Sequence, residues 1–249
     1  MSGRFFRRAD AGLIVQKLCV KAVFERGLIA DGDRILIAAS GGKDSTVLAW
    51  ALAAIRPALK ISYELAALHI SSDFCACCKK SALSQQLAAW GIPFSDLAVP
   101  VIGRLKEGKK MNCWWCSTQR RTELLKYAVE NGFNKIALGH HLDDIIETFF
   151  MNMCAKGALE AMPIMLKYRK YPATLIRPLA YLEERQIIAC ADEQGILKAA
   201  CTCPFGINSQ RRDFRNGIAA FSKETGLDPG DLKRAILSSL SCPKDFLAQ

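Results

Sequence analysis

The sequence predicts an open, parallel α/β sheet of about five strands, flanked by helices and extended by further helices at both ends. Short apolar segments rich in Ile, Val and Leu alternate with longer segments whose apolar residues recur at helical spacing. Strands that alternate with helices indicate βαβ units, and such units build parallel sheets. No internal repeat or low-complexity linker interrupts the alternation. One compact domain is therefore the simplest organisation.

The predicted elements follow one another in regular order. Strands are expected at 34–40, 63–70, 93–100, 135–140 and 174–179. Helices are expected at 43–56, 79–90, 117–131, 142–156 and 181–194. Gly132 and Gly195 follow two of these helices, in the position that glycine favours at a helix C-terminus. Residues 1–30 are expected to form an N-terminal helical extension, residues 31–204 the main domain, and residues 205–249 a C-terminal helical tail with a break at 226–231.

Composition and charge indicate a cytoplasmic protein with a polyanionic partner. No segment approaches the ~18 unbroken apolar residues of a membrane span, and Lys17 interrupts the apolar run near the N-terminus. We therefore expect no membrane association. The net charge of +10 is compatible with nucleic acid binding. Eleven cysteines, an odd number without a secretion signal, favour metal-binding or catalytic thiols over a disulfide framework.

A glycine-rich turn joins the first predicted strand to the first predicted helix. A helix N-terminus that follows glycines presents backbone N–H groups, which favour phosphate, and Lys43 adds a positive charge. The Walker A pattern fails, because Ile37 stands where its first glycine is required and Asp44 follows the lysine. The turn is predicted to be a phosphate loop of another kind, made of Ser40, Gly41, Gly42, Lys43, Asp44 and Ser45.

Carboxylates cluster where a later predicted strand enters its helix near Leu142. Asp143, Asp144 and Glu147 lie at or near the first turn of this helix. Asp143 and Glu147 are four residues apart and share one face. Carboxylate oxygens are suitable ligands for Mg²⁺ between protein and phosphates. The alternative is that these aspartates only complement the helix dipole.

The cysteines form several groups. Cys113 and Cys116 make a C-x-x-C pair before an arginine-rich helix start, where the helix N-terminus, Arg120 and Arg121 favour thiolates. From spacing alone, a zinc site, a redox dithiol and an iron-sulfur cluster remain equal alternatives. The other groups are Cys201 with Cys203, and Cys75 with Cys77 and Cys78.

Several motifs in one order resemble a known family. They are S-G-G-K-D-S at 40–45, E-G-K-x-x-x-C-x-x-C-x-x-x-x-R at 107–121, A-L-G-H-H-x-D-D-I-x-E-T-x-x-x-N-M at 137–153, A-M-P at 161–163, I-R-P-L-A-Y at 176–181 and a cysteine pair before N-x-Q-R at 201–211. This order resembles the tRNA 2-thiocytidine synthetases (tRNA-cytidine 2-sulfurtransferases), N-type ATP pyrophosphatases of the PP-loop superfamily. An ordered series is more specific than any single motif.

The resemblance implies a fold and an ATP site. The fold would be a HUP-like, Rossmann-like sheet, and residues 31–204 would be a PP-loop ATP pyrophosphatase domain with an iron-sulfur site. Residues 40–45 would hold the departing pyrophosphate of ATP, with Mg²⁺. Gly139 and His140 would bind the nucleotide. The catalytic residues would be Lys43, Asp44, Asp143 and Asp144.

The resemblance also implies a [4Fe-4S] cluster on three cysteines, with one iron open to carry sulfide. Cys113 and Cys116 match directly, and the third ligand would be Cys203, with Cys201 as the alternate. The chain departs from the family here, because the family pattern C-x-x-C-G-S-Q is replaced by C-T-C-P-F at 201–205. The cysteines between 75 and 78 have no counterpart that we can place.

The implied activity is an ATP- and iron-sulfur-dependent tRNA sulfurtransferase that adenylates a base carbonyl and replaces its oxygen with sulfur, forming 2-thiocytidine. The implied partners are tRNA, through its anticodon loop, and a sulfur donor such as a cysteine desulfurase. A homodimer is compatible with the sequence, which does not determine the oligomeric state. Alternatives are another RNA base or a small molecule as acceptor, a metal-cluster nucleotide-binding protein without thiolation, and a nucleic-acid-binding module. Basic patches interleaved with aromatic residues, at 104–110, 120–121, 167–170 and 211–215, suit an RNA loop.

Overall fold

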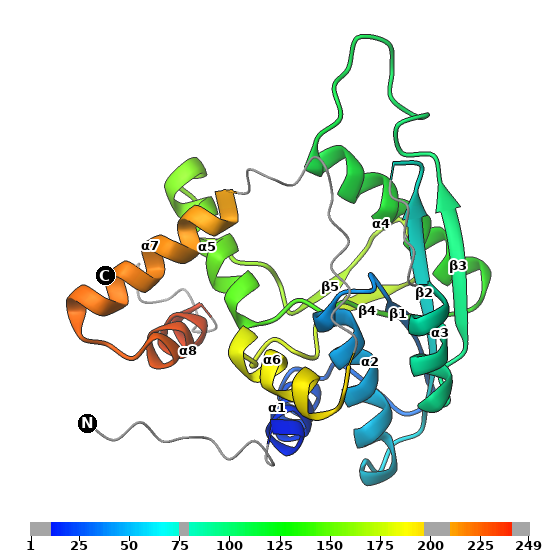
Figure 1. Ribbon diagram of the computed structural model, residues 1–249, viewed down its shortest axis with the longest axis horizontal. Coiled ribbons are helices and arrows are strands. Elements are labelled where there is room, and N and C mark those ends of the chain that lie inside the picture. Colours follow the sequence, from blue (N-terminus) through cyan, green and yellow to red (C-terminus); the bar gives the residue numbers. More distant parts are fainter. Residues whose placement is uncertain (1–10, 75–79, 197–209, 241–249) are drawn as a thin grey trace.

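A computed structural model describes residues 11–74, 80–196 and 210–240 of the chain. They form a six-stranded sheet of order β3-β2-β1-β4-β6-β5, with helices around it (Figure 1). The strands are β1 Asp33–Ala38, β2 Tyr63–Ser72, β3 Phe94–Val99, β4 Lys135–Ala137, β5 Met165–Lys167 and β6 Thr174–Ile176. The helices are α1 Ala11–Glu25, α2 Lys43–Ile55, α3 Lys80–Ala89, α4 Cys113–Glu130, α5 Leu142–Lys156, α6 Glu184–Glu193, α7 Gln210–Thr225 and α8 Pro229–Ser239, with a 3₁₀ turn η2 at Arg56–Ala58.

The predicted parallel sheet is confirmed. Strand β1 pairs in parallel with β2 and β4, β2 with β3, and β4 with β6. All five predicted strands are present. The sixth strand, β5, was not predicted, and it pairs antiparallel with β6 at the sheet edge. Its residues are largely exposed, so the segment lacks the apolar run that marked the buried strands.

Both faces of the sheet are covered, as parallel sheets require. Ile35 and Ile37 of β1 are buried in a core with α1, α2, α3 and α6. Leu36, which points to the opposite face, is buried in a second core with α4. A third cluster joins α5 to α7 and α8, and these three helices lie together at the left of Figure 1.

The order of the strands places one crevice in the sheet. The chain moves outward from β1 through β2 to β3, and then returns by α4 to β4 on the other side of β1. The connections that leave β1 and β4 therefore diverge from neighbouring strand ends. Open α/β sheets bind ligands at such a switch point, outside the carboxyl ends of the strands.

The helices follow the predicted ranges with one difference of consequence. Gly132 and Gly195 have the positive φ of glycine C-caps, 71° and 60°. However, the helix expected at 117–131 begins at Cys113, because the Asn112 side chain caps it by accepting a hydrogen bond from Trp115 N at 2.8 Å. The C-x-x-C pair therefore lies inside the first turn of α4 and not before it.

The terminal helices pack on the main body. Val15 and Cys19 of α1 are fully buried in the same core as α2 and α6. The helical tail is broken at Asp228, whose side chain caps α8 by accepting from Gly230 N and Asp231 N. The domain boundaries after residues 30 and 204 remain a prediction, and residue 204 lies outside the described residues. Among the described helices, none is long and apolar enough to cross a membrane.

Candidate active site

The phosphate loop, residues 40–45, connects β1 to α2 at the switch point. Gly41 has a φ of 81°, which favours glycine, and Gly42 is the extended N-cap of α2. Ser40 Oγ accepts a hydrogen bond from Gly42 N at 3.3 Å and lies 3.0 Å from Ser45 Oγ. The side chains thus close the loop on itself. The first N–H groups of a helix have no acceptor within the helix, so the start of α2 suits an anion.

Lys43 is held by carboxylates. Its Nζ lies 2.8 Å from Glu184 Oε1, at the start of α6, and 3.1 Å from Asp44 Oδ1. Burial alone would lower the pKa of Lys43, but the hydrogen bond to Glu184 and the charge of Asp44 outweigh it and raise that pKa. The ammonium group is therefore charged beside the phosphate loop.

The loop after β4 touches the phosphate loop through the backbone. A Cβ atom on Gly139 would lie 2.9 Å from both the carbonyl carbon of Asp44 and the amide nitrogen of Ser45. Real Cβ contacts are not this short, so only glycine fits here without a backbone shift. The sequence motifs that predict the site are thus brought together by direct contact.

His140 is a partly buried, neutral histidine on the cavity wall. Arg177 Nε donates to His140 Nδ1 at 3.2 Å, and Arg177 also donates to the Pro163 carbonyl. Burial, and then the charge of Arg177, lower the pKa of His140 to about 4. Burial likewise lowers the pKa of Arg177 to about 10. Because Nδ1 accepts, the proton of the neutral ring is assigned to Nε2.

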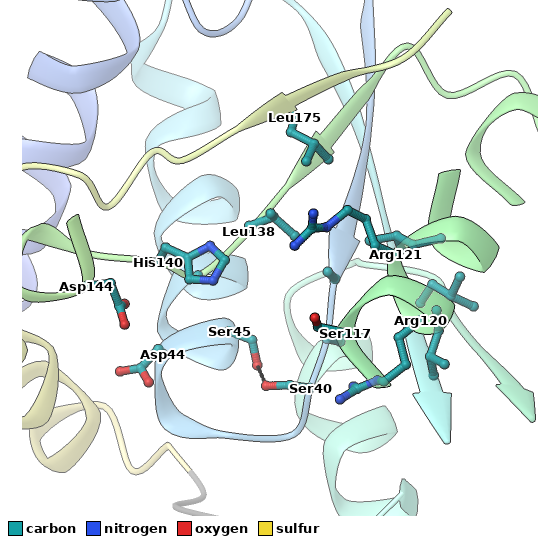
Figure 2. Close-up of a pocket in the computed structure, with 16 residues that line it drawn as sticks. Ser40, Asp44, Ser45, Ser117, Arg120, Arg121, Leu138, His140, Asp144 and Leu175 are labelled. Atoms are coloured by element: carbon teal, nitrogen blue, oxygen red, sulfur yellow. Dashed lines mark hydrogen bonds between the residues drawn. The ribbon is translucent and has the colours of Figure 1, made fainter. Parts of the chain in front are cut away.

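Asp44 and Asp144 face the same space. His141 Nε2 lies 3.9 Å from Asp44 Oδ1 and 3.4 Å from Asp144 Oδ2, and Figure 2 shows the two carboxylates on one side of the cavity. Asp144 Oδ1 also accepts from Arg211 Nη1 at 2.8 Å. In the described part of the chain, no group of three or more His, Cys, Asp or Glu could hold a metal. Mg²⁺ would therefore need phosphate oxygens beside these two carboxylates.

Asp143 points away from this space, although the sequence placed it beside Asp144. Its carboxylate accepts from Glu184 N at 2.7 Å and pairs with Lys233 of α8. Burial would raise the pKa of Asp143, but His141, Lys233 and the Glu184 N–H outweigh it and hold that pKa well below its usual range. Asp143 therefore ties α5 to α6 and α8. Its catalytic role stays a prediction without support from its position.

A cavity of about 330 Å³ opens at the switch point; we call it the nucleotide cavity. Its lining combines polar groups of both loops, including Ser40, Asp44 and His140, with Leu68, Leu124 and other apolar side chains. Figure 2 shows Arg120 and Arg121 extending from α4 towards it. A cavity of this size that combines apolar side chains with convergent polar and charged groups is typical of a ligand site. Its lining includes Ala38, Ala39, Ser40, Asp44, Ser45, Ser117, Arg120, Arg121, Leu138, Gly139, His140, Asp144 and Leu175.

Helix α4 connects the cysteine pair to this cavity. Cys113 and Cys116 lie in its first turn, with Cys113 exposed and Cys116 partly buried. Ser117, the next residue, already lines the cavity, as do Arg120 and Arg121 one turn further on. The remaining predicted ligands, Cys203 and Cys201, lie outside the described residues, as do Cys75, Cys77 and Cys78.

Several site residues were not predicted as such. Arg177 lies in the I-R-P-L-A-Y motif and Arg211 in a predicted basic patch, but neither was assigned to the site. Glu184, the partner of Lys43, is 141 residues away along the chain. No periodicity or motif links such a pair. An alignment with covariation would be the signal able to find it.

The fold and the site define a PP-loop protein, and the PP-loop domain family matches residues 15–198. The chain belongs to the tRNA-cytidine(32) 2-sulfurtransferase family. It is 36% identical to the family member from Geobacter sulfurreducens over 88% of this chain and 86% of the relative. The member from Syntrophotalea carbinolica is 36% identical over 81% of this chain and 76% of the relative. The member from Methylococcus capsulatus is 39% identical over 84% of this chain and 73% of the relative.

Solved structures share the fold. The U34-tRNA thiolase NcsA from Methanococcus maripaludis, solved with its [4Fe-4S] cluster, superposes with a TM-score of 0.75 at 20% identity, over 94% of this chain and 81% of that one. The NMN synthetase from Francisella tularensis superposes with a TM-score of 0.51 at 15% identity, over 98% of this chain and 91% of that one. At these identities the likeness concerns the fold alone.

Proposed function

We propose that the protein is an ATP-dependent tRNA sulfurtransferase that adenylates a base carbonyl and replaces its oxygen with sulfur, forming 2-thiocytidine. Family membership supports the reaction. One structural observation carries the proposal: α4 bears Cys113 and Cys116 on its first turn, and its next residues line the cavity that the phosphate loop borders. Base activation and sulfur delivery would then occur at one place.

The phosphate loop and the start of α2 would bind the triphosphate of ATP. The base carbonyl oxygen attacks the α-phosphorus, and the bond from that phosphorus to the β-phosphate bridging oxygen breaks. Lys43 would stabilise the negative charge that develops on the departing pyrophosphate. Asp44 and Asp144 would hold Mg²⁺ against the phosphate oxygens. His140 would donate a hydrogen bond from Nε2 at the cavity wall.

Two of the three predicted cluster ligands, Cys113 and Cys116, lie in the described part of the chain. Residues three apart on a helix lie on one face, so the first turn of α4 presents Cys113 and Cys116 to the same side. Cys203, with Cys201 as the alternate, would complete the set. When bound, a [4Fe-4S] cluster would supply the sulfide that replaces the activated oxygen as AMP departs.

The tRNA would approach through basic surface around the cavity. The segment between β3 and α4 projects from the body at the top of Figure 1 and carries Lys106, Lys109 and Lys110. Cations on such a segment would contact the phosphate backbone while a base of the anticodon loop enters the cavity. A cysteine desulfurase is the proposed class of sulfur donor. A cytoplasmic location and a homodimer are compatible with this proposal.

Nucleoside mass spectrometry of tRNA tests the proposal. Cells that lack the gene should lose 2-thiocytidine, and the wild-type gene should restore it, while a Lys43→Ala gene should not. Purified protein should release AMP and pyrophosphate only when tRNA is present. Unchanged 2-thiocytidine in the deletion strain, with loss of another thionucleoside, would assign the protein to a different base.

A further inference from the structure

A chain of ion pairs runs from the phosphate loop to the C-terminal helices. Glu184 Oε1 lies 2.8 Å from Lys43 Nζ, and Glu184 Oε2 lies 2.8 Å from Arg215 Nη1 of α7. Arg215 Nε in turn lies 2.6 Å from Glu147 Oε1 of α5. The two oxygens of Glu184 thus have separate partners, one on α2 and one on α7. The chain connects four helices.

The central carboxylate has little freedom to move. Glu184 is the first residue of α6, and its N–H donates to Asp143 Oδ2 at 2.7 Å, which fixes the backbone against α5. The side chains of Lys43 and Glu184 are only 23% and 25% exposed. Glu147, at the end of the chain, is 1% exposed. Exposed ion pairs contribute little to the free energy of unfolding, but a partly buried series of ion pairs with fixed ends restricts the movement of its side chains.

This arrangement limits where the Lys43 ammonium group can point. An ammonium has three N–H donors. Asp44 Oδ2 and Glu184 Oε1 accept two of them, at 3.4 Å and 2.8 Å. The two accepted hydrogen bonds therefore fix the direction of the third N–H of Lys43, because the ammonium group cannot rotate freely. A donor aimed in advance at a developing charge stabilises a transition state more than a mobile donor does.

We propose that Glu184 is a positioning residue for Lys43 and that Arg215 acts through Glu184. Helix α7 thereby belongs to the ATP site as well as to the outer surface of the protein. The inference rests on the proposed role of Lys43 at the pyrophosphate. The inference predicts that substitutions in α7, which lies outside the cavity, alter the rate at which ATP is cleaved to AMP.

Steady-state kinetics of tRNA-dependent AMP formation test this role. Glu184→Ala should lower kcat at saturating ATP about 10- to 100-fold, while the KM for ATP changes by less than about threefold, because position and not ground-state binding is lost. Glu184→Gln keeps an acceptor oxygen for Lys43 and should retain more activity than the alanine variant. Arg215→Gln should lower kcat in the same direction. Lys223→Gln, an exposed change on the same helix, is the matched control and should have wild-type kinetics.

Two comparisons separate positioning from general damage. In the Glu184→Ala variant, the further change Arg215→Gln should not lower kcat any further, because Arg215 acts through the missing carboxylate. Additive losses, or an unchanged kcat in Glu184→Ala, would overturn the inference. Thermal unfolding of each variant is measured first, and the isosteric Glu184→Gln serves if the alanine variant fails to fold.

Pyrophosphate titration needs no turnover and separates this inference from the proposed function. Glu184→Ala should weaken pyrophosphate binding by at least about threefold in the protein with Lys43, because pyrophosphate already carries the charge that develops only in the transition state from ATP, and by less in a Lys43→Met background. Equal changes in both backgrounds contradict positioning through Lys43. A wild-type protein that binds pyrophosphate with this coupling but forms no AMP with tRNA keeps the inference and overturns the proposed function.

Discussion

Gly139 and Ser45 are in backbone contact: a Cβ atom on Gly139 would lie 2.9 Å from the Ser45 amide nitrogen. The contact joins the loop that follows β4 to the loop that follows β1. It does not depend on a positive φ, because Gly139 has none. The missing side chain itself is what lets the two halves of the nucleotide cavity meet.

We predict that Gly139→Ala separates the two loops. The backbone must move to admit the methyl group, which should destabilise the protein by about 1–3 kcal/mol and lower AMP formation strongly. Gly217→Ala is the matched control, because nothing lies within 4 Å of its Cβ position in the middle of α7. That change should stabilise the helix by about 0.5–1 kcal/mol. Urea unfolding of both variants checks the contrast, and equal effects would rule out the steric explanation.

Lys43→Met should remove charge stabilisation from the departing pyrophosphate. We expect kcat for AMP formation to fall about 10²- to 10³-fold, the cost of losing one well-placed transition-state donor. Affinity for tRNA, measured by filter binding, should stay the same. Lys60→Met, an exposed change before the amino end of β2, should leave both quantities unchanged. Full activity of Lys43→Met would show that the Lys43 charge has no role in catalysis.

Cys113→Ser and Cys116→Ser should each lose the cluster. Protein purified without oxygen should contain iron and acid-labile sulfide, and each serine variant should contain little of either. Cys154→Ser, at an exposed position on α5, controls for the loss of an arbitrary thiol and should keep both. Zinc in place of iron, lost in the same two variants, would favour the structural zinc alternative.

The imidazoles should titrate on opposite sides of pH 6.5. Burial lowers the pKa of His69, and burial with the charge of Arg177 lowers that of His140 to about 4. For His141, burial is outweighed by the carboxylates of Asp143 and its neighbours, so the pKa is raised above 6.5. The chain has three histidines, so their ring NMR signals can be followed individually with pH. Titration of all three rings near pH 6.5 would contradict the environments that the structure gives them.

These shifts also set the pH dependence of stability. Between pH 6.5 and about 4, His140 takes up a proton in the unfolded chain but not in the folded one. The contribution of His140 to the free energy of unfolding therefore falls as the pH falls. His141 has the opposite effect: it stabilises the fold at low pH, and this contribution is lost as the pH rises through its raised pKa. His140→Gln should therefore flatten the acid limb of the unfolding curve, as measured by urea titration at several pH values.

The parts of the fold that local sequence controls were predictable. Strand and helix periodicities extend over a few residues each, and they located β1, β4, α2 and α5 correctly. The glycines at 41 and 42, followed by Lys43, predicted a phosphate loop for the same reason, because a strand, a turn and a helix start are contiguous in the chain. The order of motifs then identified the family.

Tertiary structure alone decided which side chains meet. Asp143 and Asp144 are equivalent in sequence, but neighbours on a helix point about 100° apart, so only Asp144 faces the cavity while Asp143 joins Lys233. The start of α4 is the exception, because the Asn112 cap that places the cysteine pair in the first turn is a local signal that the predicted helix range overlooked. Glu184 reaches Lys43 across 141 residues because α6 and α2 pack in one core. Local patterns determine elements, whereas contacts between elements follow from packing that no short stretch of chain contains.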